Sequence, residues 1–218
     1  MTFRWVTMIA FVALLGCLFL HHLIFPCGYK SRFSFGSLIR KKVHLFTLLF
    51  LPQKLGWSGR LCKLAFLLGL LSFCVLALTG FGPLVFGGHL QGYLLMIHAT
   101  FAPVFIACAA VVAILAAGRY VFNKKDAEAA LHIYKCGRGK ECWLTDTGVG
   151  AKVGFWFLLI MTLPVTLTMV LSMLPLFGST GQEFLFHAHR WCALVFAMAA
   201  IIELYILIRL SVIEDFQL

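Results

Sequence analysis

Long apolar runs separated by polar connections set the pattern of this 218-residue chain. Five of the runs are long enough, at ~1.5 Å per helical residue, to cross the ~30 Å hydrocarbon layer of a bilayer. Lipid offers the backbone no hydrogen-bond partners, so runs of this length favour helices, which satisfy their own backbone groups. The runs lie at roughly residues 5–26, 64–86, 90–117, 153–176 and 185–208. The pattern predicts an all-α integral membrane bundle of about five transmembrane helices.

The composition fits a membrane protein better than a soluble one. Hydrophobic residues make up 62% of the chain and charged residues 12%, which is more apolar surface than a soluble domain of this size buries. The first run is as long as a full span and no Ala-x-Ala cleavage site follows it, so we interpret it as a membrane helix and not as a signal peptide. The net charge of +10 lies mainly in the connections, so we expect no nucleic-acid partner.

The distribution of basic residues predicts the orientation. Residues 27–63 carry eight Lys or Arg and no acid, and residues 118–152 carry seven against four acids. With five spans, both connections and the C-terminus share one face, which the positive-inside rule assigns to the cytoplasm. We therefore expect a multi-pass protein of a bacterial-type inner membrane, with its N-terminus outside. A short apolar stretch, Val43 to Leu51, is too short to span and predicts an interfacial helix.

Histidines within the spans carry the candidate chemistry, because a buried imidazole in lipid needs a partner. His98 lies in the third run, and His187 and His189 open the fifth, so all three are expected at similar depth in the outer half of the bilayer. Two imidazoles at one depth on neighbouring helices match the axial ligands of a six-coordinate haem. Structural interhelical hydrogen bonds are the alternative. Residues two apart on a helix point in different directions, so only His187 or His189 can face the haem.

Two neighbouring features fit a haem at this depth. Arg190 could pair with the propionates through its planar guanidinium. Small residues such as Gly92 could let the flat ring approach the backbone. No Cys-x-x-Cys-His occurs, which excludes covalent attachment of c-type haem.

The last four runs resemble the membrane cytochrome b subunits of formate dehydrogenase and nickel–iron hydrogenase, the gamma-subunit type. The resemblance rests on Leu76-Ala77-Leu78-Thr79-Gly80, on the Gly92…His98 run, and on Leu185…His189-Arg190-Trp191…Ala193-Leu194. It implies a chain divided into an additional N-terminal transmembrane helix (1–26), a basic loop (27–63) and a four-helix cytochrome b-like domain (64–218).

The resemblance also implies a set of ligands. The outer haem of the family would be bound here by His98 and His189. Both ligands of the family's inner haem are missing, and Glu203 stands at the position of one of them. This implies a one-haem protein, in which Glu203 and Tyr205 become candidates for a quinone or proton path. A displaced second haem, bound by His21 or His22 with His44, is the alternative.

The function implied is that of a haem b membrane subunit of a respiratory complex. It would transfer electrons between membrane quinone and an iron–sulfur or multihaem subunit at the outer, periplasmic face. Two alternatives stay open. One is a haem-free structural anchor for a redox complex. The other is a small transporter in which Glu203 and the histidines form a proton relay, although no internal repeat of the transporter kind is visible.

Overall fold

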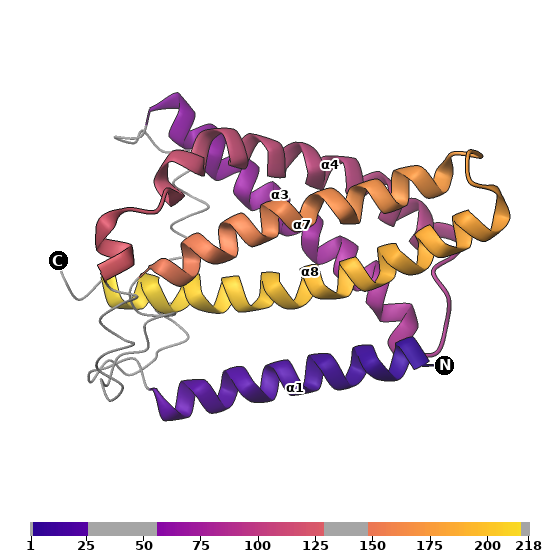
Figure 1. Ribbon diagram of the computed structural model, residues 1–218, viewed down its shortest axis with the longest axis horizontal. Coiled ribbons are helices and arrows are strands. Elements are labelled where there is room, and N and C mark those ends of the chain that lie inside the picture. Colours follow the sequence, from indigo (N-terminus) through magenta and orange to yellow (C-terminus); the bar gives the residue numbers. More distant parts are fainter. Residues whose placement is uncertain (1, 26–55, 129–147, 215–218) are drawn as a thin grey trace. The chain divides into compact units, whose positions relative to one another are not determined.

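The computed structural model describes residues 2–25, 56–128 and 148–214 of the chain. Within these residues the structure is helical and contains no strand (Figure 1). The main helices are α1 (Thr2–Ile24), α3 (Trp57–Val85), α4 (Gly92–Ala116), α7 (Val149–Met173) and α8 (Gly178–Glu214), with a short 3-10 helix η1 (Ala117–Tyr120) after α4. All five α-helices are long and apolar enough to cross a membrane. The prediction of an all-α membrane bundle with five spans is confirmed. The interfacial helix expected at 43–51, together with His44, lies outside the described residues.

Several helices extend beyond the apolar runs that predict them. α8 spans 37 residues and begins at Gly178, where the expected start was residue 185. α3 begins at Trp57, so Arg60 and Lys63 lie in its first two turns. A helix does not have to end where the hydrocarbon ends, because its backbone hydrogen bonds continue into the headgroup layer. Long basic side chains at such ends can reach the interface.

α7, in contrast, ends three residues before its expected boundary. Its last helical residue is Met173, and Leu174 is extended, with φ −89° and ψ 134°. Pro175 follows directly. The ring of a proline disfavours helical backbone at the residue before it, so the sequence itself terminates the helix here.

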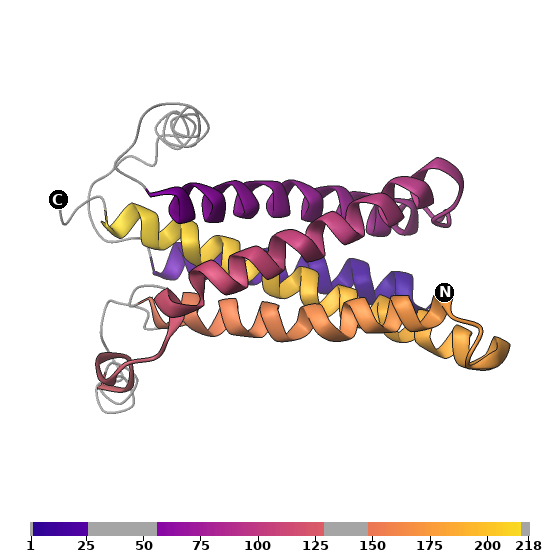
Figure 2. The ribbon, with the colours of Figure 1, turned by 90° about the horizontal axis from the view of Figure 1, so that it is seen from above.

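The chain divides into two compact units. Unit 1 comprises residues 1–27, 80–90 and 119–218, and unit 2 comprises residues 28–79 and 91–118. In unit 1, α7 and α8 lie next to each other in both views (Figures 1 and 2). Contacts join them from the level of Gly154 and Glu203 to that of Val165 and His189, so the two helices are antiparallel.

α1 is fixed to the rest of unit 1 at both of its ends. At one end, Arg4 Nη2 donates a 3.0 Å hydrogen bond to the carbonyl oxygen of Val85, and the ring of Phe3 meets Trp191 edge to face at 4.9 Å. At the other end, Arg209 Nη1 donates a 2.6 Å hydrogen bond to the carbonyl oxygen of Phe25. We name these two ends of unit 1 the Arg4 end and the Lys152 end, since Lys152 lies in the first turn of α7 beside the latter.

Unit 2 contains most of α3 and all of α4. The two helices approach closely where Gly69 lies beside Cys108: a Cβ atom added to the glycine would lie 3.3 Å from the Cβ of Cys108. Both residues are buried. Further along, the side chains of Thr79 and His98 join the same two helices. Small and polar residues at such contacts are typical of helix pairs in membranes.

Candidate functional site

His189 is held against the neighbouring helix of unit 1 by a backbone carbonyl. Its Nδ1 atom lies 2.9 Å from the carbonyl oxygen of Val165 on α7. A carbonyl oxygen only accepts hydrogen bonds, so Nδ1 carries the proton, and in the neutral ring the lone pair lies on Nε2. Metal-bound histidines commonly donate their second ring nitrogen in this way, which fixes both the tautomer and the orientation of the ring.

His187 has a different environment, although it lies only two residues earlier. Its side chain is 55% exposed, and its Nε2 lies 3.9 Å from Oε1 of Glu183, one turn back on the same helix. Of the two histidines that open the fifth span, the structure therefore packs His189 against α7 and leaves His187 on an exposed face of α8.

His98 is held in a comparable way in unit 2. Its Nδ1 atom lies 2.9 Å from Oγ1 of Thr79 on α3. The hydroxyl of Thr79 has a single hydrogen and points it at the carbonyl oxygen of Val75, 2.7 Å away, with that of Leu76 at 3.3 Å. The oxygen of Thr79 therefore accepts from Nδ1 of His98, and the lone pair of the neutral ring again lies on Nε2.

Thr79, to which sequence reasoning gave no role, contacts His98. It is buried, with 7% of its surface exposed, and stands within an apolar helix. The available signal was a lone hydroxyl near the end of an apolar run, with a histidine expected at similar depth on the next span.

Gly92 has a backbone reason to be glycine. It opens α4 with φ +57°, a left-handed conformation that a side chain disfavours, and a Cβ atom added here would meet nothing within 4 Å. The conformation accounts for the glycine at this position without the approach of a flat ring.

Arg190 stacks on aromatic rings at the Arg4 end of unit 1. Its guanidinium carbon lies 4.2 Å from the ring centroid of Phe3 on α1 and 5.7 Å from that of Phe186. This is a cation–π geometry. Stacking engages the face of the guanidinium and leaves its N–H groups directed along the plane, which is the edge that binds carboxylates.

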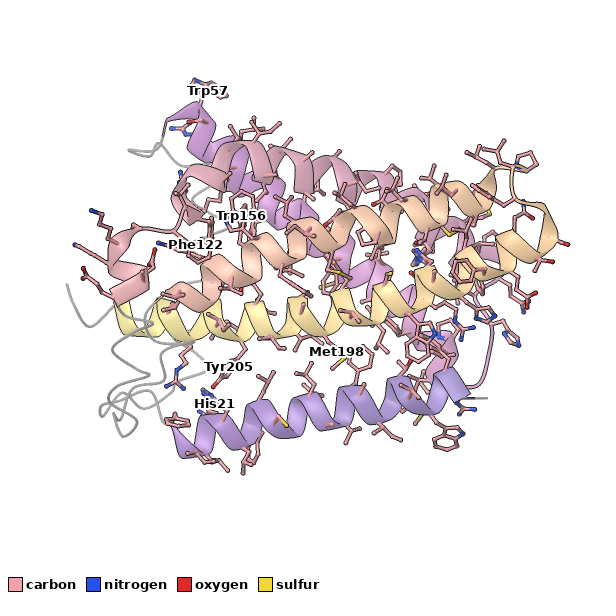
Figure 3. The ribbon with its side chains drawn as sticks, viewed as in Figure 1. His21, Trp57, Phe122, Trp156, Met198 and Tyr205 are labelled. Carbon is pink, nitrogen blue, oxygen red and sulfur yellow. The ribbon has the colours of Figure 1, made fainter. Side chains whose placement is uncertain are left out.

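Tyr205 and Glu203 lie two residues apart on α8 but face different helices. The hydroxyl of Tyr205 lies 2.9 Å from Nδ1 of His21 on α1 and 3.4 Å from Nη1 of Arg209, and Figure 3 shows the labelled side chains of His21 and Tyr205 pointing toward each other. Glu203 instead faces α7 at Gly154. The structure thus brings Tyr205 to His21 on α1 and does not bring it to Glu203.

An ion pair at the Lys152 end joins the first turn of α7 to the connection that precedes it. Nζ of Lys152 is 2.6 Å from Oδ2 of Asp126. The side chains and backbone amides of Asn123 and Asp126 also bond reciprocally, at 2.7 Å and 3.0 Å, in the manner of a capping box. The hydrogen bond from Lys152, helped by that from the backbone of Asn123, lowers the pKa of Asp126 below its ordinary value.

The described part of the chain contains no group of three or more His, Cys, Asp or Glu placed to hold a metal ion. A haem iron needs only two ligands from the protein, because the porphyrin supplies four nitrogens. His98 and His189 each have an imidazole nitrogen of the kind that binds haem iron. No protein family, curated protein or solved structure matches the chain.

Proposed function

We propose that this chain is a haem b-binding membrane subunit that transfers electrons, with His98 and His189 as the two axial ligands. The observation that carries the proposal is the matched state of the two rings. In each, Nδ1 donates to a fixed acceptor from a neighbouring helix, and the lone pair lies on Nε2. Nε2 is the atom that would bind the iron in a ring held through Nδ1 in this way.

The protein supports this role through the groups around the ligands. Thr79 Oγ1 and the carbonyl oxygen of Val165 orient the two rings and raise their basicity as ligands. Arg190, stacked on Phe3, would pair its N–H edge with a propionate. The apolar helices exclude water. When bound, haem b supplies one-electron oxidation and reduction, and the protein supplies its position and its potential.

The remaining assignments extend this proposal. By the positive-inside rule, the basic connections favour a cytoplasmic Lys152 end in a bacterial-type membrane, with the N-terminus outside. Membrane quinone is the proposed electron partner within the bilayer, and an iron–sulfur or multihaem subunit is the proposed partner at the outer face. A respiratory complex is the proposed setting for this subunit.

The test uses the full chain in phospholipid vesicles, with duroquinol as a small soluble quinol. Reduced-minus-oxidised spectra are recorded after duroquinol and again after dithionite. We expect a b-type spectrum with dithionite and a partial spectrum with duroquinol, and neither in His98→Ala. A folded protein with no haem spectrum would refute the proposal and leave a structural anchor. A haem that dithionite reduces and duroquinol does not would refute the quinone assignment alone.

A further inference from the structure

Glu203 is a buried acid that the proposed haem site does not use. It lies on α8 within unit 1 and is 7% exposed. Its side chain faces Gly154 on α7, where a Cβ atom added to the glycine would lie 2.7 Å from Cδ of Glu203 and nearer still to Oε2. The missing side chain of Gly154 therefore creates the recess that the carboxyl group occupies.

The carboxyl group is not paired in that recess. Oε2 is buried and has no hydrogen-bond partner among the described residues. The titratable groups on the helices that pack on α8 at this end have bonds directed elsewhere. On α7, Lys152 pairs with Asp126. On α8 and α1, Tyr205 bonds to His21, and Arg209 bonds to Phe25. His22 lies in the last turn of α1.

An ionised carboxylate without a partner is strongly disfavoured away from water, whereas the neutral acid is tolerated. Basic residues are nevertheless close to Glu203 along both helices. Glu203 stands six residues before Arg209 on α8, about 9 Å at the helical rise, and Gly154 stands two residues after Lys152 on α7, about 3 Å. The acid thus lies near the Lys152 end of unit 1, a short distance along the helices from two basic side chains.

We propose that Glu203 is a reversible proton-binding site inside the bilayer, which takes its proton from the Lys152 end. In the resting protein the carboxyl group holds the proton, and it releases the proton when a positive charge or a hydrogen-bond donor enters the recess. The proton site stands without haem. Its coupling to electron transfer rests on the proposed function: loss of an electron from the haem would favour release of the proton from Glu203, and return of the electron would favour its rebinding.

The test is modification by dicyclohexylcarbodiimide, an apolar reagent that attacks protonated carboxyl groups. The full chain in lipid nanodiscs is treated between roughly pH 5 and pH 9, and the modified peptide is identified by mass spectrometry. We expect modification at Glu203, with a rate that falls roughly tenfold per pH unit above the midpoint. Glu183, whose side chain on the same helix is 75% exposed, is the matched acid and should react with a water-soluble carbodiimide instead.

Two variants separate the proposal from a structural role for Glu203. Glu203→Gln keeps the shape and removes the proton, so modification should disappear while the helix content is unchanged. Gly154→Ala fills the recess, so the carboxyl group is displaced and the rate should fall. A folded wild-type chain that is unmodified at Glu203 at every pH would overturn the proposal, and so would a rate independent of pH. None of these results depends on haem, so the proposal for Glu203 can be refuted without refuting the haem proposal, and the reverse also holds.

Discussion

Two polar side chains of α8 pack against α7 in contrasting ways. His189 donates from Nδ1 to the carbonyl oxygen of Val165 at 2.9 Å. Glu203, fourteen residues further along, lies against Gly154 with Oε2 buried and without a hydrogen-bond partner among the described residues. The same pair of helices thus provides a fixed acceptor at one level and an apolar recess at the other.

The difference teaches what each position can do. A ring held by a carbonyl has one orientation and one tautomer, which suits a ligand that must not move. A buried carboxyl group without a fixed partner is stable when protonated and can ionise only when a partner arrives, which suits a group that gains and loses a proton. The two positions are separated by about 21 Å along the helix at 1.5 Å per residue, so they can be perturbed independently.

Replacing His189 should have the largest effect. His189→Ala removes a proposed axial ligand, and we expect loss of nearly all haem from the purified chain. His187→Ala is the matched control, since His187 lies on the same turn but is exposed, and it should retain wild-type haem. Haem content per chain is measured by the pyridine haemochrome method. Equal loss in both variants would break the contrast between the two histidines.

Filling the recess should have the next largest effect. Gly154→Ala places a methyl group against the carboxyl group of Glu203, and overpacking of this kind costs about 1–3 kcal/mol. Because the two residues touch, Glu203→Ala should recover part of that loss. Thermal unfolding in detergent measures both the single and the double variants.

Gly16→Ala is the control for helix propensity in that experiment. Gly16 lies within α1 with nothing near its added Cβ atom, so alanine should be neutral or stabilising there by roughly 0.5–1 kcal/mol. If Gly154→Ala behaves like Gly16→Ala, the recess at Glu203 does not exist as described.

Thr79 in unit 2 contacts the Nδ1 atom of His98 as the carbonyl oxygen of Val165 contacts that of His189. Thr79→Val keeps the shape but removes the oxygen that accepts from His98. Loss of an outer-shell partner typically weakens metal binding by about 10–100-fold, so we expect weaker haem retention during dilution and a shifted reduction potential. Thr79→Ser keeps the hydroxyl and should restore both. A potential identical in wild type and Thr79→Val would show that Thr79 has only a packing role.

Asp126 is an acid with a partner and can be compared with Glu203, which has none among the described residues. Replacing Asp126 should have the smallest effect on stability. Its pKa is lowered in the folded chain by the hydrogen bond from Lys152. A lowered pKa stabilises the fold above the ordinary value of a free Asp, and this contribution is lost as pH falls through the lowered value. Wild type should therefore lose slightly more stability than Asp126→Asn between roughly pH 7 and pH 3. Identical melting curves at both pH values would show that the ion pair contributes nothing.

The spans could be predicted from the sequence because length and apolarity are local properties. The ends were harder to predict. Hydropathy falls where the lipid ends, but the helical hydrogen bonds of α8 continue from Gly178 to Glu214. Among these ends, that of α7 is set by a single residue, Pro175. This proline lies close to the predicted boundary at residue 176.

The candidate site could be predicted less completely. Spacing along α8 shows that His187 and His189 cannot face the same way, but only the position of the Val165 carbonyl on α7 decides which of them packs against α7. Tyr205 and Glu203 are close in sequence, yet one faces α1 and the other α7. No pattern in the chain indicates that α1 lies along α8, so the bond between His21 and Tyr205 could not be foreseen.

The central claim is that two histidines with fixed tautomers bind one haem. The most direct measurement is the number of haem b groups per purified chain, determined by the pyridine haemochrome method in wild type, His98→Ala and His189→Ala. We predict one haem per wild-type chain and nearly none in either variant. Wild-type haem content in both variants, or no haem in a folded wild-type chain, would contradict the account.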